Sequence, residues 1–289
     1  MKAPLVSIVI PAHNEASVIG RNLARLLEGT APGEFDVIVV PNACTDRTAE
    51  VAAAVTGVRV IESPIPGKVP ALRLGDEACL TFPRVYLDAD VELTAASVRA
   101  LVAACARPGV LACSPVPELD LARVGRLIGR VHRVHDRMMA PLRALAGAGV
   151  YVLTEAGHAR VFPMPDVISD DGWVHASFAP HERAVVAEAR SVVRPARTVG
   201  AHLDRRVRVR RGNRQLAALR VGPDGSGGSS ASPSLGSLVR LVRRRTVSPV
   251  DATAYLSVLF LDRAVSRLRR DDSAWGSDAS TRTPALSGD

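Results

Sequence analysis

Four runs of β-branched and aliphatic residues, each followed by a polar loop and then by a helical pattern, occupy the first third of this chain. The runs cover residues 5–10, 36–40, 58–61 and 85–87. Continuous apolar runs of this kind are typical of strands buried on both faces, and helical connections between them are those of βαβ units. We therefore predict an α/β fold, in which a doubly wound, mostly parallel sheet carries helices on both faces.

The polar loops after these strands are expected at one edge of the sheet, because parallel strands all end on the same side. Ligands of such sheets bind outside the carboxyl ends of the strands. The loops concerned begin at Pro11, Pro41 and Asp88. No Gly-x-Gly-x-x-Gly sequence follows the first strand and no P-loop sequence occurs, which disfavours a dinucleotide fold and a P-loop site.

Asp88 and Asp90 flank Ala89 directly after the fourth run. Residues i and i+2 of an extended segment point the same way, so the two carboxylates can converge on one cation, or on a ribose and a cation. Mg²⁺ and Mn²⁺ bind carboxylates together with phosphate oxygens, which makes a nucleotide diphosphate the natural ligand of such a pair. An acidic turn without a ligand is the alternative.

Lys68 follows Gly67 and is one of only two lysines in the chain. Elsewhere the chain uses arginine as its basic residue. A lysine presents a compact point charge, which suits a position beside phosphate, and a chance placement is the alternative.

The net charge of +8 is unevenly distributed, with ten arginines between residues 190 and 220 and four more at residues 240–245. Such a region can contact an anionic membrane surface, phosphorylated substrates or nucleic acid. Almost no aromatic residues lie between the arginines, so nucleic acid is not favoured as a partner. A solvated arginine-rich face is the alternative.

The cysteine pattern and the hydropathy of the chain indicate in which cellular compartment the protein is expected. The four cysteines form no C-x-x-C pair, which indicates reduced thiols and no zinc site. Neither a signal peptide nor an apolar run of about 18 residues is recognisable. We therefore expect a cytoplasmic protein, with peripheral contact at the inner membrane face as a further hypothesis.

The second half of the chain offers fewer signals. Leu121–Met139 has the pattern of an amphipathic basic helix, which packs on the core or, alternatively, contacts a membrane or an acceptor. Asp170 and Asp171 precede Trp173, and they are either first-turn charges of a helix or a general base beside an apolar platform. The remaining predictions are a basic segment at 205–211, a flexible linker at 222–234, helices within 235–270 and a disordered tail at 271–289.

Five sequence elements together resemble those of the family 2 glycosyltransferases, which have the GT-A fold, a Rossmann-like nucleotide-diphospho-sugar transferase fold. They occur in the family's order: Ile10 to Glu15, Asn42 to Thr48, Gly67-Lys68 with Ala71-Leu72 and Gly75, Asp88 to Asp90, and Ser169 to Asp171. The resemblance implies a GT-A domain over residues 1–221, with a nucleotide-binding half up to residue 114, an acceptor half over 115–221 and a helical C-terminal extension.

The resemblance further implies a metal-dependent, inverting transfer from a nucleotide-diphospho-sugar, with a UDP-sugar as the expected donor. By analogy, the base and ribose pocket and the phosphate site would be formed by Pro11, Ala12, Glu15, Asn42, Lys68, Asp88 and Ala89. Asp90, with Asp88, would hold Mg²⁺ or Mn²⁺ between the two phosphates. Asp171, with Asp170 beside it, would be the general base that deprotonates the acceptor hydroxyl.

Two further sequence features refine this expectation. The Gln-x-x-Arg-Trp sequence of processive members is absent, which implies a single transfer. Arg73 stands where the family frequently has asparagine. The acceptor is left open among a lipid carrier, a saccharide and a small natural product.

Two other functions compete with this one. A nucleotidyltransferase also uses a doubly wound sheet and metal-binding carboxylates, but it usually begins with a glycine-rich basic loop that this chain lacks. The other is a non-catalytic basic binding module derived from the same fold, which loss of Asp90 or Asp171 would have favoured.

Overall fold

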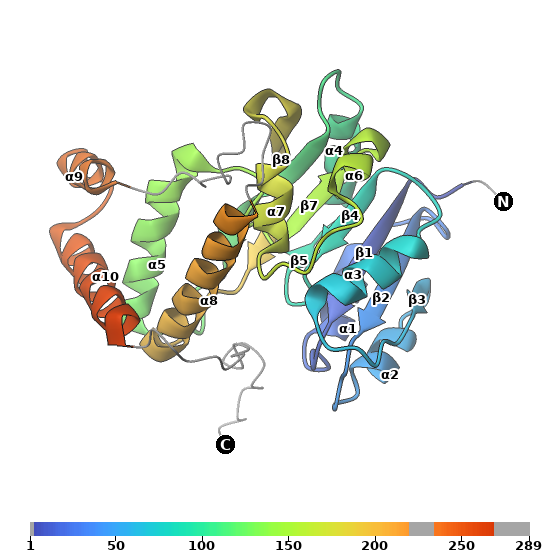
Figure 1. Ribbon diagram of the computed structural model, residues 1–289, viewed down its shortest axis with the longest axis horizontal. Coiled ribbons are helices and arrows are strands. Elements are labelled where there is room, and N and C mark those ends of the chain that lie inside the picture. Colours follow the sequence, from blue (N-terminus) through green and yellow to red (C-terminus); the bar gives the residue numbers. More distant parts are fainter. Residues whose placement is uncertain (1–2, 220–233, 269–289) are drawn as a thin grey trace.

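The structure is a computed structural model that describes residues 3–219 and 234–268 of the chain. A mixed sheet with helices on both faces forms one side of the molecule, and a layer of long helices forms the other (Figure 1). Most of the predicted linker and the whole predicted tail lie outside the described residues.

Eight strands form a single sheet in the order β3-β2-β1-β4-β7-β6-β8-β5. The strands are β1 (Val6–Ala12), β2 (Phe35–Pro41), β3 (Val58–Val60), β4 (Arg84–Leu87), β5 (Glu92–Leu93), β6 (Ala112–Leu119), β7 (Val150–Leu153) and β8 (Arg183–Val193). Strands β1 to β4 are mutually parallel, whereas β7 is antiparallel to β4 and to β6, and β5 is antiparallel to β8. The prediction of a doubly wound, mostly parallel α/β fold is confirmed.

Helices cover both faces of the sheet and build a separate helical layer. They are α1 (Ile19–Leu27), α2 (Thr48–Ala53), α3 (Lys68–Glu77), α4 (Ala95–Cys105), α5 (Arg126–Met139), α6 (Glu155–Val161), α7 (Asp170–Ala176), α8 (Val199–Ala218), α9 (Leu235–Arg243) and α10 (Pro249–Leu268), with 3-10 turns η1 (Ala140–Leu142) and η2 (Pro180–Glu182). Within the described parts of the chain, every helix is too short or too polar to cross a bilayer.

Burial on both faces explains why the first strands have continuous apolar sequences. In β1, Ile8 lies in the core on the side of α1 and α4, and Val9 lies in the core on the side of α3. Gly75 allows α3 to approach closely, because a Cβ at this position would come within 2.5 Å of Val9 Cγ1. Strand β1 and helix α3 are therefore held in tight contact behind the edge where the loops meet.

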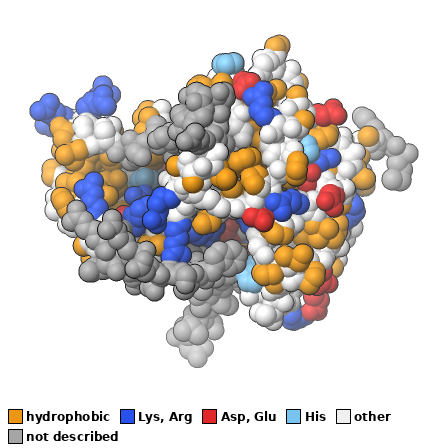
Figure 2. Space-filling view, viewed as in Figure 1, with side chains coloured by type: hydrophobic (Ala, Val, Ile, Leu, Met, Phe, Trp, Pro, Cys, Tyr) orange, Lys and Arg blue, Asp and Glu red, His pale blue; other side chains and the backbone are white. Residues whose placement is uncertain are grey.

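The long helices α5, α8, α9 and α10 share a third apolar cluster. The apolar face of α5, which includes Ile128 and Val131, packs against residues of α9 and α10 such as Leu238 and Tyr255. The basic helix expected at 121–139 is therefore a packed helix, and its apolar face is not available to a membrane. Figure 2 shows Lys and Arg side chains gathered over this end of the molecule.

The structure defines two elements of the second half. The basic segment predicted at 205–211 is the middle of the twenty-residue helix α8, which begins where the Thr198 hydroxyl accepts a hydrogen bond from Ala201 N at 3.2 Å. Strand β8 has eleven residues and pairs with the whole length of β6.

Candidate active site

The loops after β1 and β2 meet at the carboxyl edge of the sheet through one buried asparagine. Asn42 is 4% exposed; its Nδ2 donates to Ala12 O at 2.8 Å, and its Oδ1 accepts from Gly67 N at 3.2 Å. Pro11 and Ala12 end β1 beside it and are buried. Asn42 therefore joins the ends of β1 and β2 to the loop that carries Lys68.

The loop after β1, which contains Glu15, is held against the loop after β2 by hydrogen bonds from its backbone amides to side chains. Glu15 N donates to Thr48 Oγ1 at 2.8 Å, and Ala16 N donates to Asp46 Oδ2 at 3.1 Å. Glu15 itself is 7% exposed. The elements expected at 10–15 and 42–48 thus form one continuous wall of the site.

The Asp88-Ala89-Asp90 turn is fixed through its main chain. Asp88 N donates to Gly149 O at 2.9 Å, Asn22 Nδ2 of α1 donates to Ala89 O at 2.8 Å, and Arg194 Nη1 donates to Asp90 O at 3.3 Å. These contacts leave the side chain of Asp90 without a hydrogen bond or ion pair to any residue within 3–219 or 234–268. A rigid turn therefore presents a carboxylate that is ready to take an external ligand.

Lys68 joins the Asp88-Ala89-Asp90 turn to the later acidic pair, Asp170 and Asp171. Its Nζ lies 2.5 Å from Asp88 Oδ1 and 2.8 Å from Asp170 Oδ1. Burial opposes the charge on the lysine, but the two carboxylates outweigh it and raise the pKa of Lys68. Burial raises the pKa of Asp170, which is only 4% exposed, against the opposing charge of Lys68.

Asp171, unlike its neighbour, is stabilised as an anion. Its Oδ2 accepts from Gly147 N at 2.9 Å, and its Oδ1 accepts from Ser169 Oγ at 2.8 Å and from Gly172 N at 2.7 Å. Burial alone would raise the pKa of Asp171, but Lys68 and these donors overcome it and hold the pKa below its usual value. The two adjacent carboxylates therefore have opposite environments: Asp170 is a buried ion-pair partner, and Asp171 is a half-buried anion.

The loop Gly147-Ala148-Gly149 brings the two acidic motifs together, and the sequence reasoning assigned it no part in the site. Gly147 holds Asp171, and Gly149 holds Asp88 through its carbonyl. Gly149 has φ +65°, and a Cβ there would lie 2.5 Å from Val91 Cγ2, so a side chain is excluded. The sequence feature that could have indicated this role is the pair of glycines directly before strand β7.

Arg194 is a second residue that sequence reasoning missed. It follows β8, is largely buried, and pairs with Glu92 and, at 3.3 Å, with Asp120 Oδ2. Its contact with Asp90 O ties the end of β8 to the acidic turn. Nothing in the sequence distinguishes it from the other arginines between residues 190 and 220.

The segment before Asp170 is held from two sides. Arg73 of α3 donates from Nε to Met164 O at 2.7 Å and pairs with Asp166 at 3.0 Å. Gln215 of α8 accepts from Ile168 N and donates to Asp166 O, both at 2.8 Å. Arg73, where the resemblance suggested asparagine, therefore helps to position the segment that leads to the second acidic pair.

Replacing Gln215 by alanine is expected to lower the free energy of unfolding by about 1–2 kcal/mol, because two hydrogen bonds to the loop backbone are lost. Amide hydrogen exchange should accelerate over residues 164–171. The matched control is Asn213→Ala, which removes an exposed amide from the same helix. Equal exchange in both variants would contradict a clamping role for Gln215.

The side chains of the site can hold a divalent cation only if a bound phosphate compound supplies part of the coordination. No group of three or more His, Cys, Asp or Glu side chains that could hold a metal occurs in the described chain. Asp88 and Asp90 offer two carboxylates, and the side chain of Asp88 is 35% exposed toward the site. Mg²⁺ and Mn²⁺ commonly bind in this way, with one or two carboxylates completed by phosphate oxygens.

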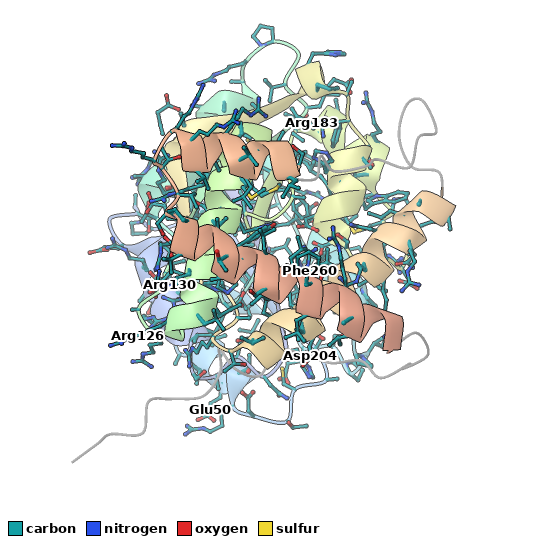
Figure 3. All side chains as sticks on the ribbon, turned by 90° about the vertical axis from the view of Figure 1, so that its left-hand side faces the viewer. Glu50, Arg126, Arg130, Arg183, Asp204 and Phe260 are labelled. Carbon is teal, nitrogen blue, oxygen red and sulfur yellow. The ribbon has the colours of Figure 1, made fainter. Side chains whose placement is uncertain are left out.

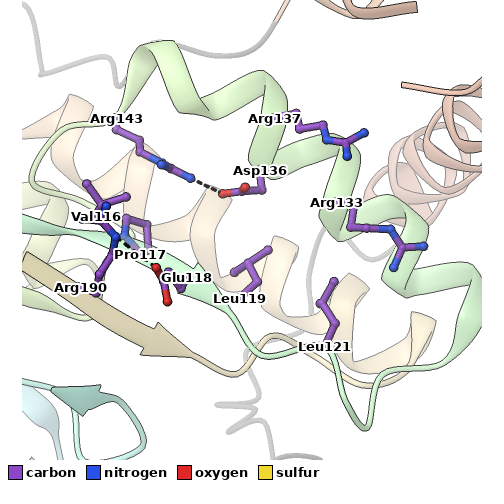
Figure 4. Close-up of a pocket in the computed structure, with 10 residues that line it drawn as sticks. All are labelled: Val116, Pro117, Glu118, Leu119, Leu121, Arg133, Asp136, Arg137, Arg143 and Arg190. Carbon is purple, nitrogen blue, oxygen red and sulfur yellow. Dashed lines mark hydrogen bonds and ion pairs between the residues drawn. The ribbon is translucent and has the colours of Figure 1, made fainter. Parts of the chain in front are cut away.

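A separate pocket of about 490 Å³ lies between the second half of β6, Arg190 of β8 and helix α5 (Figure 4). Arg143 points into it and pairs with Asp136 at 2.7 Å, and Arg190 pairs with Glu118 at 3.1 Å. Arg143 also precedes the loop that carries Gly147. The pocket therefore lies within the half of the chain expected to bind the acceptor.

Comparison with known proteins finds a family model that matches the first half of the chain and solved structures with a similar fold. The model of the family described as glycosyl transferase family 2 matches residues 7–126. The mannosyltransferase PcManGT from Pyrobaculum calidifontis, solved in complex with GDP-Man and Mn²⁺, is 18% identical over 94% of this chain and 89% of that chain, with a TM-score of 0.63. Glucosyl-3-phosphoglycerate synthase from Mycobacterium tuberculosis, solved with Mn²⁺, uridine diphosphate and glucosyl-3-phosphoglycerate, is 22% identical over 68% and 75% of the two chains, with a TM-score of 0.48. No curated protein matches the chain.

Proposed function

We propose that this chain, which is a glycosyltransferase of family 2 with the GT-A fold, catalyses a single, inverting, metal-dependent sugar transfer from a nucleotide-diphospho-sugar to an acceptor hydroxyl. The observation that carries the proposal is the convergence of Lys68, Asp88 and Asp170, with Asp171 beside them, at the carboxyl edge of the sheet. The unengaged carboxylate of Asp90 lies in the same turn as Asp88.

The donor is proposed to bind along the wall formed by Pro11, Ala12, Glu15 and Asn42, with its diphosphate toward Lys68. Asp90, with Asp88, would hold Mg²⁺ or Mn²⁺, and the cation would neutralise the charge that grows on the departing diphosphate. Lys68 is already positively charged in its ion pairs, so it can complement phosphate oxygens without a proton transfer.

Asp171 is the proposed general base. It takes the proton from the acceptor hydroxyl as the hydroxyl oxygen forms its bond to the anomeric carbon and the bond to the nucleotide diphosphate breaks. The Gly147, Ser169 and Gly172 donors keep the carboxylate ionised and fix its direction. Asp170 is proposed to act through Lys68, by holding the ammonium group near the diphosphate.

The nucleotide is proposed to be UDP, with GDP as the first alternative. The similar mannosyltransferase was solved with GDP-Man, which supports including guanosine nucleotides in any test. The buried amide of Asn42 is engaged by Ala12 and Gly67, so discrimination of the base is proposed to rest on the shape of the wall.

The acceptor is proposed to approach from the half formed by residues 115–221, where the 490 Å³ pocket lies. A lipid carrier, a saccharide and a small natural product each remain in the proposal. The proposed place of action is the cytoplasm, with peripheral contact at the inner face of an anionic membrane. The free cysteines and the basic helical end support this assignment.

A thermal-shift panel of nucleoside diphosphates and nucleotide-sugars, with and without Mn²⁺ or Mg²⁺, tests the donor site. We expect one nucleotide to raise the melting temperature only when the metal is present, because ligands that bind the native state alone stabilise it. A rise independent of metal would contradict the role of the acidic turn. No rise with any nucleotide, in folded protein, would favour a non-catalytic binding module.

A further inference from the structure

The outer surface of the helical layer belongs to α9 and α10. These helices cover the apolar face of α5, so they form the outermost layer at that end of the molecule, as Figure 3 shows with Phe260 on α10 facing the viewer. Their inner faces contribute Leu238, Ala252, Tyr255 and Val258 to the cluster shared with α5. The residues on their outer faces are therefore free to meet a partner.

The outward stripe of α10 is uncharged among the side chains that the structure describes, and the exposed Arg263 borders it with its guanidinium 6.0 Å from the centre of the Phe260 ring. At 100° per residue, one face of the helix opposite the buried Tyr255 carries Val250, Thr253, Ser257, Phe260, Leu261 and Ala264. Val250 and Phe260 are each 63% exposed, and Leu261 is 44% exposed. A surface helix normally turns a polar face outward, so large apolar side chains on the outward face as well as on the inward face are unusual.

Helix α9 continues the same kind of surface and adds positive charge. Leu235 is 65% exposed and Val239 is 44% exposed, one turn apart. Arg243 follows one turn later, and with Arg240 and the two arginines after the helix it makes four exposed arginines at residues 240–245. No acidic residue occurs between residues 234 and 250, and none of the four arginines forms an ion pair within the described chain.

Large exposed hydrophobic residues are concentrated on these two helices. Of eleven such residues in the described chain, five lie on α9 and α10: Leu235, Val239, Val250, Phe260 and Leu261. We call these five residues, with the four arginines at 240–245, the α9–α10 face. Exposed apolar patches of this kind mark interaction sites rather than ordinary solvent-facing surface.

We propose that the α9–α10 face docks on the surface of an anionic lipid bilayer. Arginines without acidic partners complement anionic headgroups, and neighbouring apolar side chains can enter the boundary between headgroups and acyl chains. An uncharged stripe flanked by unpaired cations suits such a boundary, which is anionic outside and apolar within. The inference deepens the location proposed above, and it does not depend on the transfer reaction.

Co-sedimentation of the full chain with vesicles tests this surface. We expect binding to vesicles of phosphatidylcholine with phosphatidylglycerol, weak binding to phosphatidylcholine alone, and loss of binding in high salt. Replacing the four arginines by glutamine should weaken binding on the order of 600-fold, because each of the four near such a surface contributes about five-fold. Phe260→Ser with Leu261→Ser should weaken it about ten-fold.

The matched control is Leu5→Ser with Leu80→Ser, which removes two exposed leucines from the sheet half. The control should bind vesicles as the unmodified chain does. The nucleotide-dependent thermal shift is also measured in every variant. It should be unchanged, because none of the altered residues lies in the donor site. A failure of vesicle binding can therefore be distinguished from a failure of the proposed transferase function.

Three outcomes would overturn the inference. The first is no binding of the unmodified chain to anionic vesicles at low salt. The second is equal binding by the unmodified chain and the α9–α10 variants. The third is a dimer in light scattering that the Phe260→Ser, Leu261→Ser variant dissociates, which would show that a second copy of the chain covers this face.

Discussion

Replacing Asp171 by asparagine is expected to slow sugar transfer by about 10²–10⁴-fold, the usual contribution of a general base. The substituted amide cannot take the proton of the acceptor hydroxyl. Donor binding should remain, because Asp171 accepts its hydrogen bonds from its own segment and from Gly147, and not from residues of the proposed donor wall. Transfer is measured as nucleotide diphosphate released in the presence of acceptor, and donor binding by thermal shift.

The matched control for this substitution is Asp166→Asn. Asp166 is an exposed carboxylate five residues earlier in the same segment, with Arg73 as its ion-pair partner. It should retain transfer within a few-fold. If Asp171→Asn and Asp166→Asn transferred sugar equally well, the assignment of the base would be wrong.

The lowered pKa of Asp171 gives this prediction a pH dependence. A carboxylate whose folded pKa lies below its unfolded value contributes stability above the unfolded value of 3.8 and loses that contribution as the pH falls through the folded pKa. The base is therefore ionised throughout the neutral range. Transfer by the unmodified enzyme should show no loss from protonation of Asp171 between pH 5 and pH 8.

Replacing Asp90 by alanine is expected to abolish the metal-dependent thermal shift produced by the nucleotide, and transfer with it. The carboxylate supplies one of the two protein ligands proposed for the cation, and a single remaining ligand at Asp88 is already engaged by Lys68. Without ligands the melting temperature should barely change, because the Asp90 side chain has no partner in the described structure and exposed substitutions usually stay within about 0.5 kcal/mol.

Glu62→Ala is the control for Asp90→Ala. Glu62 is an exposed carboxylate just beyond β3, at the same edge of the sheet. It should leave the metal-dependent shift intact, which shows that the effect is not a general response to lost negative charge. A full metal-dependent shift in Asp90→Ala would remove Asp90 from the metal site.

The nucleotide-binding half was predictable because its signals are local. A run such as residues 36–40 must be a strand buried on both faces, and the residues after it must then lie at the carboxyl edge. Asp88 and Asp90 directly follow β4, so their place at this edge follows from the position of the strand, although the chain turns at Ala89 and Asp90 and does not continue as the extended segment that we expected. The contact of Lys68 with Asp88 was not predicted, because helix α3 connects β3 to β4 across β2 and β1 and no local pattern sets where its first residue lies.

The acceptor half was less predictable because its elements depend on distant contacts. The four residues of β7 give no sign of their direction, yet their antiparallel insertion between β4 and β6 places Gly149 beside Asp88. Alternating valine and arginine at 205–211 imitates an exposed strand. Helix α8 forms there because Leu203, Gly212 and Leu216 are buried against the rest of the protein, which a local pattern does not reveal.

The ion pairs of Lys68 also bear on the attraction between the site and its proposed donor. The carboxylates of Asp88, Asp170 and Asp171 all act on the single ammonium group of Lys68, and Asp90 follows in the same turn as Asp88. An anionic nucleotide-sugar would meet electrostatic repulsion from these carboxylates. A divalent cation held by Asp88 and Asp90 would lower this repulsion, so we expect the metal to raise the affinity for the nucleotide-sugar and for the released nucleotide alike.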